Sequence, residues 1–131
     1  MLHRYALQGP GLVSVSDAPL AATLWIDLLE PTPEEEHAVE VQCGIDVPTR
    51  EEMREIETSN RLYEDNGALY MTSTVLWKAD TALPETTQVT FILTGSHLVT
   101  NRYADLLSFK SFAGFAQNHP TVCSSPSPAG I

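Results

Sequence analysis

The alternation of apolar and polar positions predicts a chain built mainly from β-strands. Residues 2–7 and 12–15 are short runs with β propensity on either side of Gly9-Pro10-Gly11, a cluster that favours a turn. Residues 24–29 form an apolar run that is too short for a helix and ends at Glu30-Pro31, which is typical of a buried strand. We therefore expect an N-terminal hairpin followed by a strand inside a sheet.

A first helix is predicted directly after this strand. Thr32 is placed to act as its N-cap, Pro33 to occupy the first helical position, and Glu35 to complete a capping box. Gly44 supplies the left-handed residue that commonly ends a helix.

A second helix start follows almost at once and repeats the same pattern. Thr49 is the predicted N-cap, and Glu52 stands three residues later, ahead of the apolar Met53 and Ile56. The sequence thus predicts two short acidic helices, one after the other.

From residue 61 the apolar period changes to two, which indicates strands again. Asn66-Gly67, the strongest short hairpin signal, separates residues 62–64 from residues 69–77. A second hairpin is predicted across Gly95-Ser96, joining residues 89–93 to residues 97–100. One face of the longest strand carries Leu69, Met71, Val75 and Trp77.

The last predicted element is an amphipathic helix over residues 105–117, packed against the sheet. Residues 1–119 are expected to form one domain, and residues 120–131 a flexible Ser/Pro-rich tail. The order β-β-β-α-α-β-β-β-β-α predicts an α/β (α+β) fold with a mixed sheet of about six to seven strands and helices on its faces. The apolar residues at helical spacing are Leu106, Phe109, Ala113 and Ala116.

Charge and composition limit the classes of molecule that this chain is expected to bind. Seventeen acidic residues against seven basic ones give a formal net charge of −10, which disfavours nucleic acid and anionic lipid surfaces. The acidic residues concentrate between Asp27 and Asp65, where they form either an oxygen-rich surface suited to hard divalent cations or a solvated face that aids solubility. No apolar run approaches the roughly 20 residues needed to cross a bilayer, so we expect no direct membrane contact by this chain.

Motifs for catalysis and for thiolate metal sites are absent from the sequence. It has no phosphate-binding glycine loop and no nucleophile elbow, so we do not expect an enzyme or a required cofactor. Cys43 and Cys123 form no C-x-x-C pair, which suits a reducing cytosol. No histidine is spaced for a zinc site; the four are His3, His37, His97 and His119.

Several segments in order resemble the N-terminal cytoplasmic domain of the CorA family of divalent-cation (magnesium/cobalt) transport proteins. The resemblance extends to about His119. It rests on Trp25-Ile26-Asp27-Leu28, Pro31 and an acidic helix, Gly44-Ile45, Thr49-Arg50-Glu51-Glu52-Met53, Leu62-Tyr63-Glu64, residues 69–76, residues 89–93 and Leu98-Val99-Thr100.

This resemblance implies a cytoplasmic, magnesium-sensing domain of a pentameric transporter, at the cytoplasmic side of the inner membrane. In family members an acidic pair followed by an apolar residue contributes to regulatory cation sites between subunits. The matching residues are Glu51 and Glu52, ahead of Met53, and family members commonly have Asp at the second position. Mg²⁺ is thus the implied regulatory ligand. The alternative role of Glu52 is the capping box with Thr49.

The family pore motif, Gly-Met-Asn, is missing, because none of the three methionines is followed by Asn. The chain as given is thus expected to lack the pore, as a truncated or frameshifted product or as a standalone regulatory fragment. The leading hypothesis is a cation-sensing domain of a magnesium or cobalt transport system. The alternative is a standalone acidic protein-interaction domain without an ion role.

Overall fold

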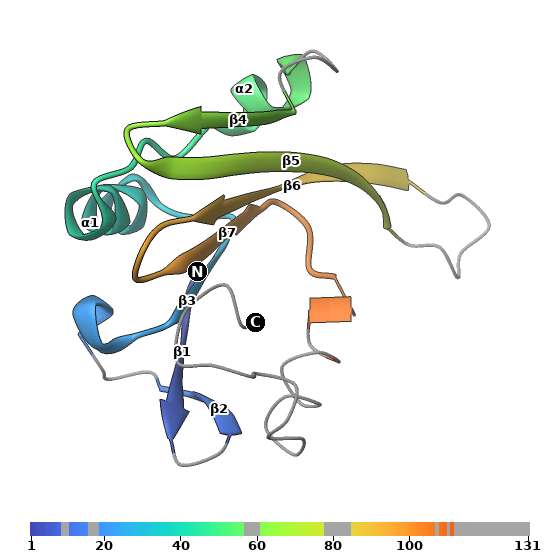
Figure 1. The fold of residues 1–131 in the computed structure, drawn as a ribbon. Helices are drawn as coiled ribbons and strands as arrows, with labels where there is room; N and C mark the ends of the chain where they lie inside the picture. Colours follow the sequence, from blue (N-terminus) through green and yellow to red (C-terminus); the bar gives the residue numbers. More distant parts are fainter. Residues whose placement is uncertain are drawn as a thin grey trace.

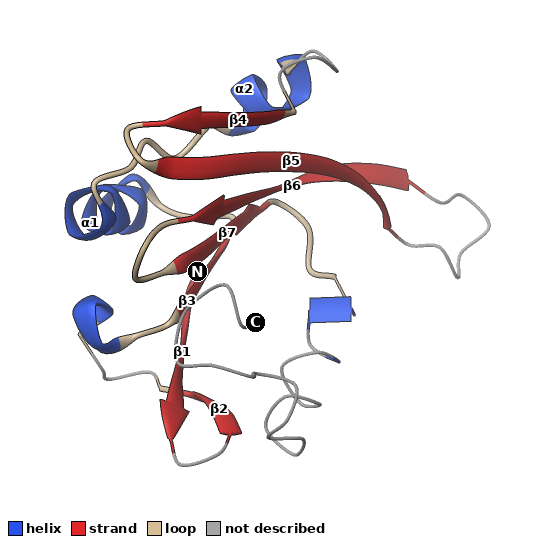
Figure 2. Ribbon diagram, viewed as in Figure 1, coloured by secondary structure: helices blue, strands red, loops and turns tan. Residues whose placement is uncertain are grey.

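One seven-stranded sheet organises the structure, a computed structural model that describes residues 1–8, 11–15, 19–56, 61–77, 85–106, 108–109 and 111. The strand order is β2-β1-β3-β7-β6-β5-β4 (Figure 1). The strands are β1 (Leu2–Gln8), β2 (Gly11–Ser14), β3 (Trp25–Leu29), β4 (Leu62–Asp65), β5 (Ala68–Trp77), β6 (Glu85–Leu93) and β7 (Leu98–Arg102). The helices are η1 (Leu20–Ala22), α1 (Pro33–Cys43) and α2 (Arg50–Glu55) (Figure 2).

The sheet is mixed, because β3 and β7 run parallel while the other strand pairs of the described chain are antiparallel. Parallel neighbours need a long crossover, and here it contains α1, α2 and strands β4 to β6. The predicted fold class and strand order along the chain are confirmed. The N-terminal hairpin pairs Gln8 with Gly11, and most of the helix predicted over 105–117 and the whole tail predicted over 120–131 lie outside the described residues.

The first helix begins with the capping box predicted from its sequence. The Thr32 hydroxyl accepts a hydrogen bond from the Glu35 N–H (3.2 Å), and the Glu35 carboxylate accepts one from the Thr32 N–H (2.9 Å). Gly44 ends the helix in the left-handed conformation, with φ of 65°. Glu35 also accepts a hydrogen bond from the Met1 ammonium at 2.9 Å, which ties the N-terminus to α1.

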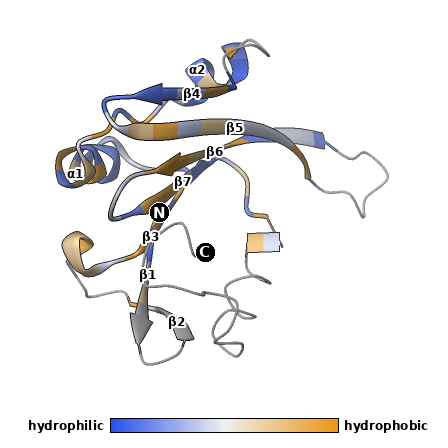
Figure 3. Cartoon of the chain, viewed as in Figure 1, coloured by the Kyte–Doolittle hydropathy of each residue, from blue (hydrophilic) through white to orange (hydrophobic). Residues whose placement is uncertain are grey.

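The two faces of the sheet bury different groups, since successive strand residues point to opposite sides. The face toward α1 and the loop before α2 carries the main apolar core. Its fully buried members include Ile26 and Leu28 of β3, Ile92 of β6 and Val99 of β7, packed with Val39 and Val47. The opposite face packs Val89 against Ala104 and Leu106. Figure 3 shows α1 as half hydrophobic and β4 as hydrophilic, as expected for a covering helix and an edge strand.

Strand β5 buries the face that its sequence pattern does not favour. Leu69 and Met71 are 44% and 42% exposed, whereas Ala68 and Tyr70 are each 2% exposed. Tyr70 lies beneath the loop after α1, where its hydroxyl accepts a hydrogen bond from the Asp46 N–H at 3.1 Å. The two helices cover this face, and an alternating pattern alone does not tell which face will be covered.

The β4–β5 turn has a positive φ at both central residues, 51° at Asn66 and 81° at Gly67, as a two-residue hairpin turn requires. Replacing Gly67 with valine should lower the free energy of unfolding by about 1 kcal/mol or more, because a β-branched residue disfavours this conformation. Chemical denaturation measures the change. Gly95→Ala is the control, because a methyl group there meets open space; an equal loss in both variants would contradict the assignment to backbone conformation.

Candidate functional site

Helix α2 carries the acidic pair singled out in the sequence, and its capping box is formed. The Thr49 hydroxyl accepts a hydrogen bond from the Glu52 N–H (3.2 Å), and Oε1 of Glu52 accepts one from the Thr49 N–H (3.0 Å). Met53 is 2% exposed and anchors the helix on the sheet. The capping role expected for Glu52 is therefore confirmed.

Both carboxylates of the pair face solvent at the first turn of α2. The cap uses one oxygen of Glu52, and Oε2 has no hydrogen-bond partner among the described residues. A carboxylate can accept at several lone-pair positions, so capping and a further contact through Oε2 are compatible.

Asn101 of β7 holds α2 in place on the sheet. This fully buried side chain donates from Nδ2 to the Pro48 carbonyl at 2.9 Å and to Met53 Sδ at 3.5 Å. Sequence reasoning did not single out Asn101, because its two contacts are long-range. Pro48 lies 53 positions before it in the sequence, and Met53 lies 48 positions before it.

Several carboxylates lie on α1, on the loop after it and on α2. Glu40 accepts a hydrogen bond from the Val47 N–H at 3.0 Å. Burial raises the pKa of Asp46, and a hydrogen bond with Glu40 and repulsion from Glu40 and Glu52 act in the same direction. Burial also raises the pKa of Glu36, reinforced by Glu40 and Glu52 and opposed by a hydrogen bond from Tyr103. Repulsion among these carboxylates therefore adds to burial in raising the pKa values of Glu36 and Asp46.

The raised pKa of Asp46 predicts that Asp46→Asn stabilises the protein at neutral pH. The folded-state pKa of Asp46 lies above its ordinary value of 3.8, so ionisation costs stability above that folded pKa and the cost disappears as the carboxyl protonates. The variant should therefore have a higher Tm than the native chain near pH 7, with the difference shrinking as the pH falls toward 4. Thermal unfolding across pH tests this. Glu64→Gln, which removes the same charge from the exposed strand β4, is the control; an equal gain in Tm in both variants would contradict a local effect at Asp46.

The described residues do not by themselves form a complete metal site. No group of three or more His, Cys, Asp or Glu side chains in the described part of the chain is arranged to hold a metal ion. Mg²⁺ prefers six oxygen ligands and keeps several waters. Glu51 and Glu52 with bound waters fit that chemistry, and further protein ligands would come from outside the described residues.

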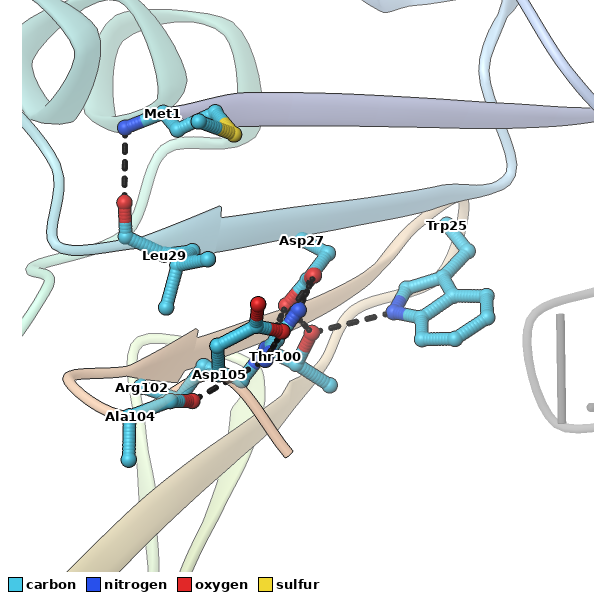
Figure 4. Close-up of polar contacts among 8 residues, drawn as sticks. All are labelled: Met1, Trp25, Asp27, Leu29, Thr100, Arg102, Ala104 and Asp105. Atoms are coloured by element: carbon cyan, nitrogen blue, oxygen red, sulfur yellow. Dashed lines mark hydrogen bonds and ion pairs between the residues drawn. The ribbon is translucent and has the colours of Figure 1, made fainter. Parts of the chain in front are cut away.

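Beneath the opposite face of the sheet lies a buried polar network that joins β3 to β7 (Figure 4). Arg102 donates from Nε and Nη2 to the carboxylate of Asp27, with a shortest distance of 2.7 Å. Thr100 donates its hydroxyl proton to Asp27 at 2.8 Å and accepts a hydrogen bond from Trp25 Nε1 at 3.0 Å. These four residues are each at most 4% exposed.

The network secures the sheet where its strands run parallel. Arg102 also donates to the Ala104 carbonyl at 3.0 Å, and its guanidinium lies 4.5 Å from the centroid of the Phe109 ring. Its charge is thus neutralised and enclosed within the chain, which makes it a structural feature rather than a binding site. Trp25 is buried, as expected for the strand predicted over residues 24–29, and Asp27 accepts hydrogen bonds from both Thr100 and Arg102.

The other polar side chains singled out in the sequence are structural or exposed. His97 is buried, and its Nδ1 lies 2.8 Å from the Thr23 carbonyl. His37 is exposed on α1, and His119 lies outside the described residues. Burial raises the pKa of Cys43 to about 11, so the thiolate form is disfavoured at neutral pH. Among the described helices, none is long and apolar enough to span a bilayer.

Sequence comparison finds relatives among the CorA magnesium transport proteins. A magnesium transport protein CorA from Pectobacterium atrosepticum is 30% identical over 103 residues, which are 79% of this chain and 33% of that protein. One from Escherichia coli is 30% identical over 125 residues, 93% of this chain and 40% of that protein. The chain therefore spans about a third to two fifths of these relatives. No family model matches it.

Solved structures show the same fold. The CorA magnesium transporter from Methanocaldococcus jannaschii aligns with 88% of this chain and 36% of its own, with a TM-score of 0.62 and 14% sequence identity. The soluble domain of CorA from the same organism aligns with 92% of this chain and 48% of its own, with a TM-score of 0.63 and 14% identity. At that identity the likeness establishes the fold.

Proposed function

Because this chain is homologous to the CorA magnesium transport proteins and has the fold of the CorA soluble domain, we propose that it is the cytoplasmic, cation-sensing domain of a magnesium or cobalt transporter. In this proposal it regulates transport and takes no part in enzyme catalysis. It works within a homo-oligomer, a pentamer as the family resemblance implies, whose other parts supply the pore.

We assign the cation contact to Glu51 and Glu52. The observation that carries this assignment is the exposed acidic pair on the first turn of α2, with Oε2 of Glu52 still available after capping. The nearby carboxylates of α1 and its following loop add negative potential, since repulsion from Glu40 and Glu52 contributes, after burial, to the raised pKa values of Glu36 and Asp46. A divalent cation at α2 would relieve part of this repulsion, so its binding is favoured beyond the two direct contacts.

The partial site accounts for how sensing would depend on assembly. Two carboxylates and waters bind Mg²⁺ weakly, and ligands from a neighbouring subunit or another segment would strengthen the site. The cation would then favour the assembled state over the separated one, and its loss would release that constraint.

Thermal unfolding of the chain tests this assignment. MgCl2 should raise the Tm more than NaCl at equal ionic strength, because a ligand that binds the folded state stabilises it by mass action. Glu52→Gln should abolish the difference while keeping the helix cap, since glutamine also completes a capping box.

Glu55→Gln provides the matched control on the same helix. It removes the same charge but leaves both proposed ligands, so the magnesium-specific gain in Tm should persist. Equal behaviour of the two variants would reject the assignment to Glu51 and Glu52 in favour of a diffuse charge effect.

A second candidate function, an acidic protein-interaction domain, is favoured by a different observation. The edge strand β4 and the neighbouring β5 expose Leu62, Leu69 and Met71 on one face of the sheet, with Leu62 paired to Met71. Exposed apolar groups beside a sheet edge are typical of protein contacts. This candidate predicts no magnesium-specific change in Tm and a partner whose binding is lost in Leu69→Glu.

A further inference from the structure

A small polar pocket lies between α2 and the start of β6, on the side of α2 away from its acidic pair. Its volume is about 130 Å³. Its lining includes Arg50, Met53 and Arg54 from α2, Thr86 and Gln88 from β6, and Tyr103.

The basic and acidic side chains of helix α2 lie on different sides of the helix. Arg50, Met53 and Arg54 are spaced at i, i+3 and i+4, which places them on one helix face, and all three line the pocket. Within the described part of the chain, no carboxylate forms an ion pair with Arg50 or Arg54. In a chain with a net charge of −10, two guanidinium groups remain available beside one pocket.

The β6 side of the pocket presents neutral hydrogen-bonding groups. Thr90 pairs with Asn101 across β6 and β7, so their side chains point to the same face of the sheet. The side-chain amide of Asn101 donates hydrogen bonds to Pro48 and Met53, so this face of β6 is turned toward α2. Strand alternation places Gln88 and Thr86 on the same face. Glu85 and Thr87 complete the lining, so the pocket has one carboxylate beside two guanidinium groups.

Tyr103 forms a wall whose position is fixed by two contacts. Its hydroxyl donates to Glu36 Oε1 at 3.4 Å, and the Arg50 guanidinium lies 5.5 Å from its ring centroid. Stacking on an aromatic ring restricts an arginine and leaves its N–H groups free to donate at the edge.

We propose that this pocket binds the phosphate group of a small molecule. Two guanidinium groups, a threonine hydroxyl and a glutamine amide offer several donors around one cavity, and phosphate can accept from all of them through its separate oxygens. The phosphate can belong to inorganic phosphate or to a nucleotide. This site is independent of the cation contact, because it uses the opposite side of α2.

The test is a nuclear magnetic resonance titration of the 131-residue chain in a buffer without divalent cations. Inorganic phosphate should shift the side-chain signals of Arg50 and Arg54 and the amide signals of residues 86–88 in a saturable manner. NaCl at equal ionic strength should not. Tighter binding of adenosine monophosphate would identify a nucleotide as the source, and equal binding would identify free phosphate. Linear shifts that match those with NaCl would overturn the proposal.

Charge-matched variants separate the pocket from general attraction. Arg54→Gln should weaken phosphate binding by about tenfold, the expected loss for one charge-assisted hydrogen bond. Arg61→Gln removes the same charge outside the pocket, where Arg61 donates to Thr72 and Thr74 of β5, and should leave binding unchanged. Equal weakening in both variants would reject a specific site. Thr86→Val, which keeps the β-branched shape, should also weaken binding and provides the test if Arg54→Gln fails to fold.

Discussion

Replacing Arg102 with methionine should lower the free energy of unfolding by about 3–5 kcal/mol, because it leaves the Asp27 carboxylate buried without its cation. Asp27 is 1% exposed and receives two donor groups from Arg102, with a shortest contact of 2.7 Å. Thr100 would remain as a partner, but one neutral hydroxyl does not offset a buried charge. Denaturant unfolding followed by circular dichroism measures the loss.

A double variant identifies the cause of this loss. Asp27→Asn together with Arg102→Met removes both charges and keeps an amide oxygen that can accept from Thr100. The double variant should therefore be more stable than Arg102→Met alone, with a coupling energy of about 0.5–3 kcal/mol. If it were equally unstable or less stable, lost packing of the arginine side chain would explain the effect instead.

Leu28→Ala should lower the free energy of unfolding by about 2–5 kcal/mol, since it opens a cavity in the main core. Leu28 is a 0% exposed residue of β3 and belongs to the core cluster that packs the sheet against Val39 of α1. The control is the same exchange at Leu62, which is 61% exposed and should cost about 0.5 kcal/mol or less. Similar losses from both variants, measured by denaturant unfolding, would contradict the core described here.

Local signals predicted the elements of this fold well, because each one reflects interactions within a few residues. The two capping boxes, at Thr32 and Thr49, and the left-handed Gly44 are present as the sequence indicated. The Asn66-Gly67 hairpin and the seven strands also follow from local patterns. The order of elements was enough to predict a mixed sheet.

Long-range choices could not be predicted in the same way. The exposed Leu69 and the buried Tyr70 depend on which face of β5 the helices cover, and the alternating pattern is compatible with either face. The contact between Asp27 and Arg102 joins residues 75 positions apart. No spacing rule connects them, since a parallel pairing of strands through a long crossover brings them together.

The candidate site was only partly accessible to sequence reasoning. The resemblance pointed to Glu51 and Glu52, and the capping role of Glu52 followed from its spacing with Thr49. The pocket with Arg50 and Arg54 requires β6 as a second wall, and that contact appears only in three dimensions.

The most direct test of a cation contact at α2 is a titration of the isotopically labelled chain with Mn²⁺, followed by nuclear magnetic resonance. Mn²⁺ favours the same carboxylate and water ligands as Mg²⁺ and broadens the signals of nearby nuclei. We predict that substoichiometric Mn²⁺ broadens the amide signals of Glu51 and Glu52 first, and that excess Mg²⁺ restores them. Broadening centred elsewhere, or spread evenly over the acidic surface, would contradict the account.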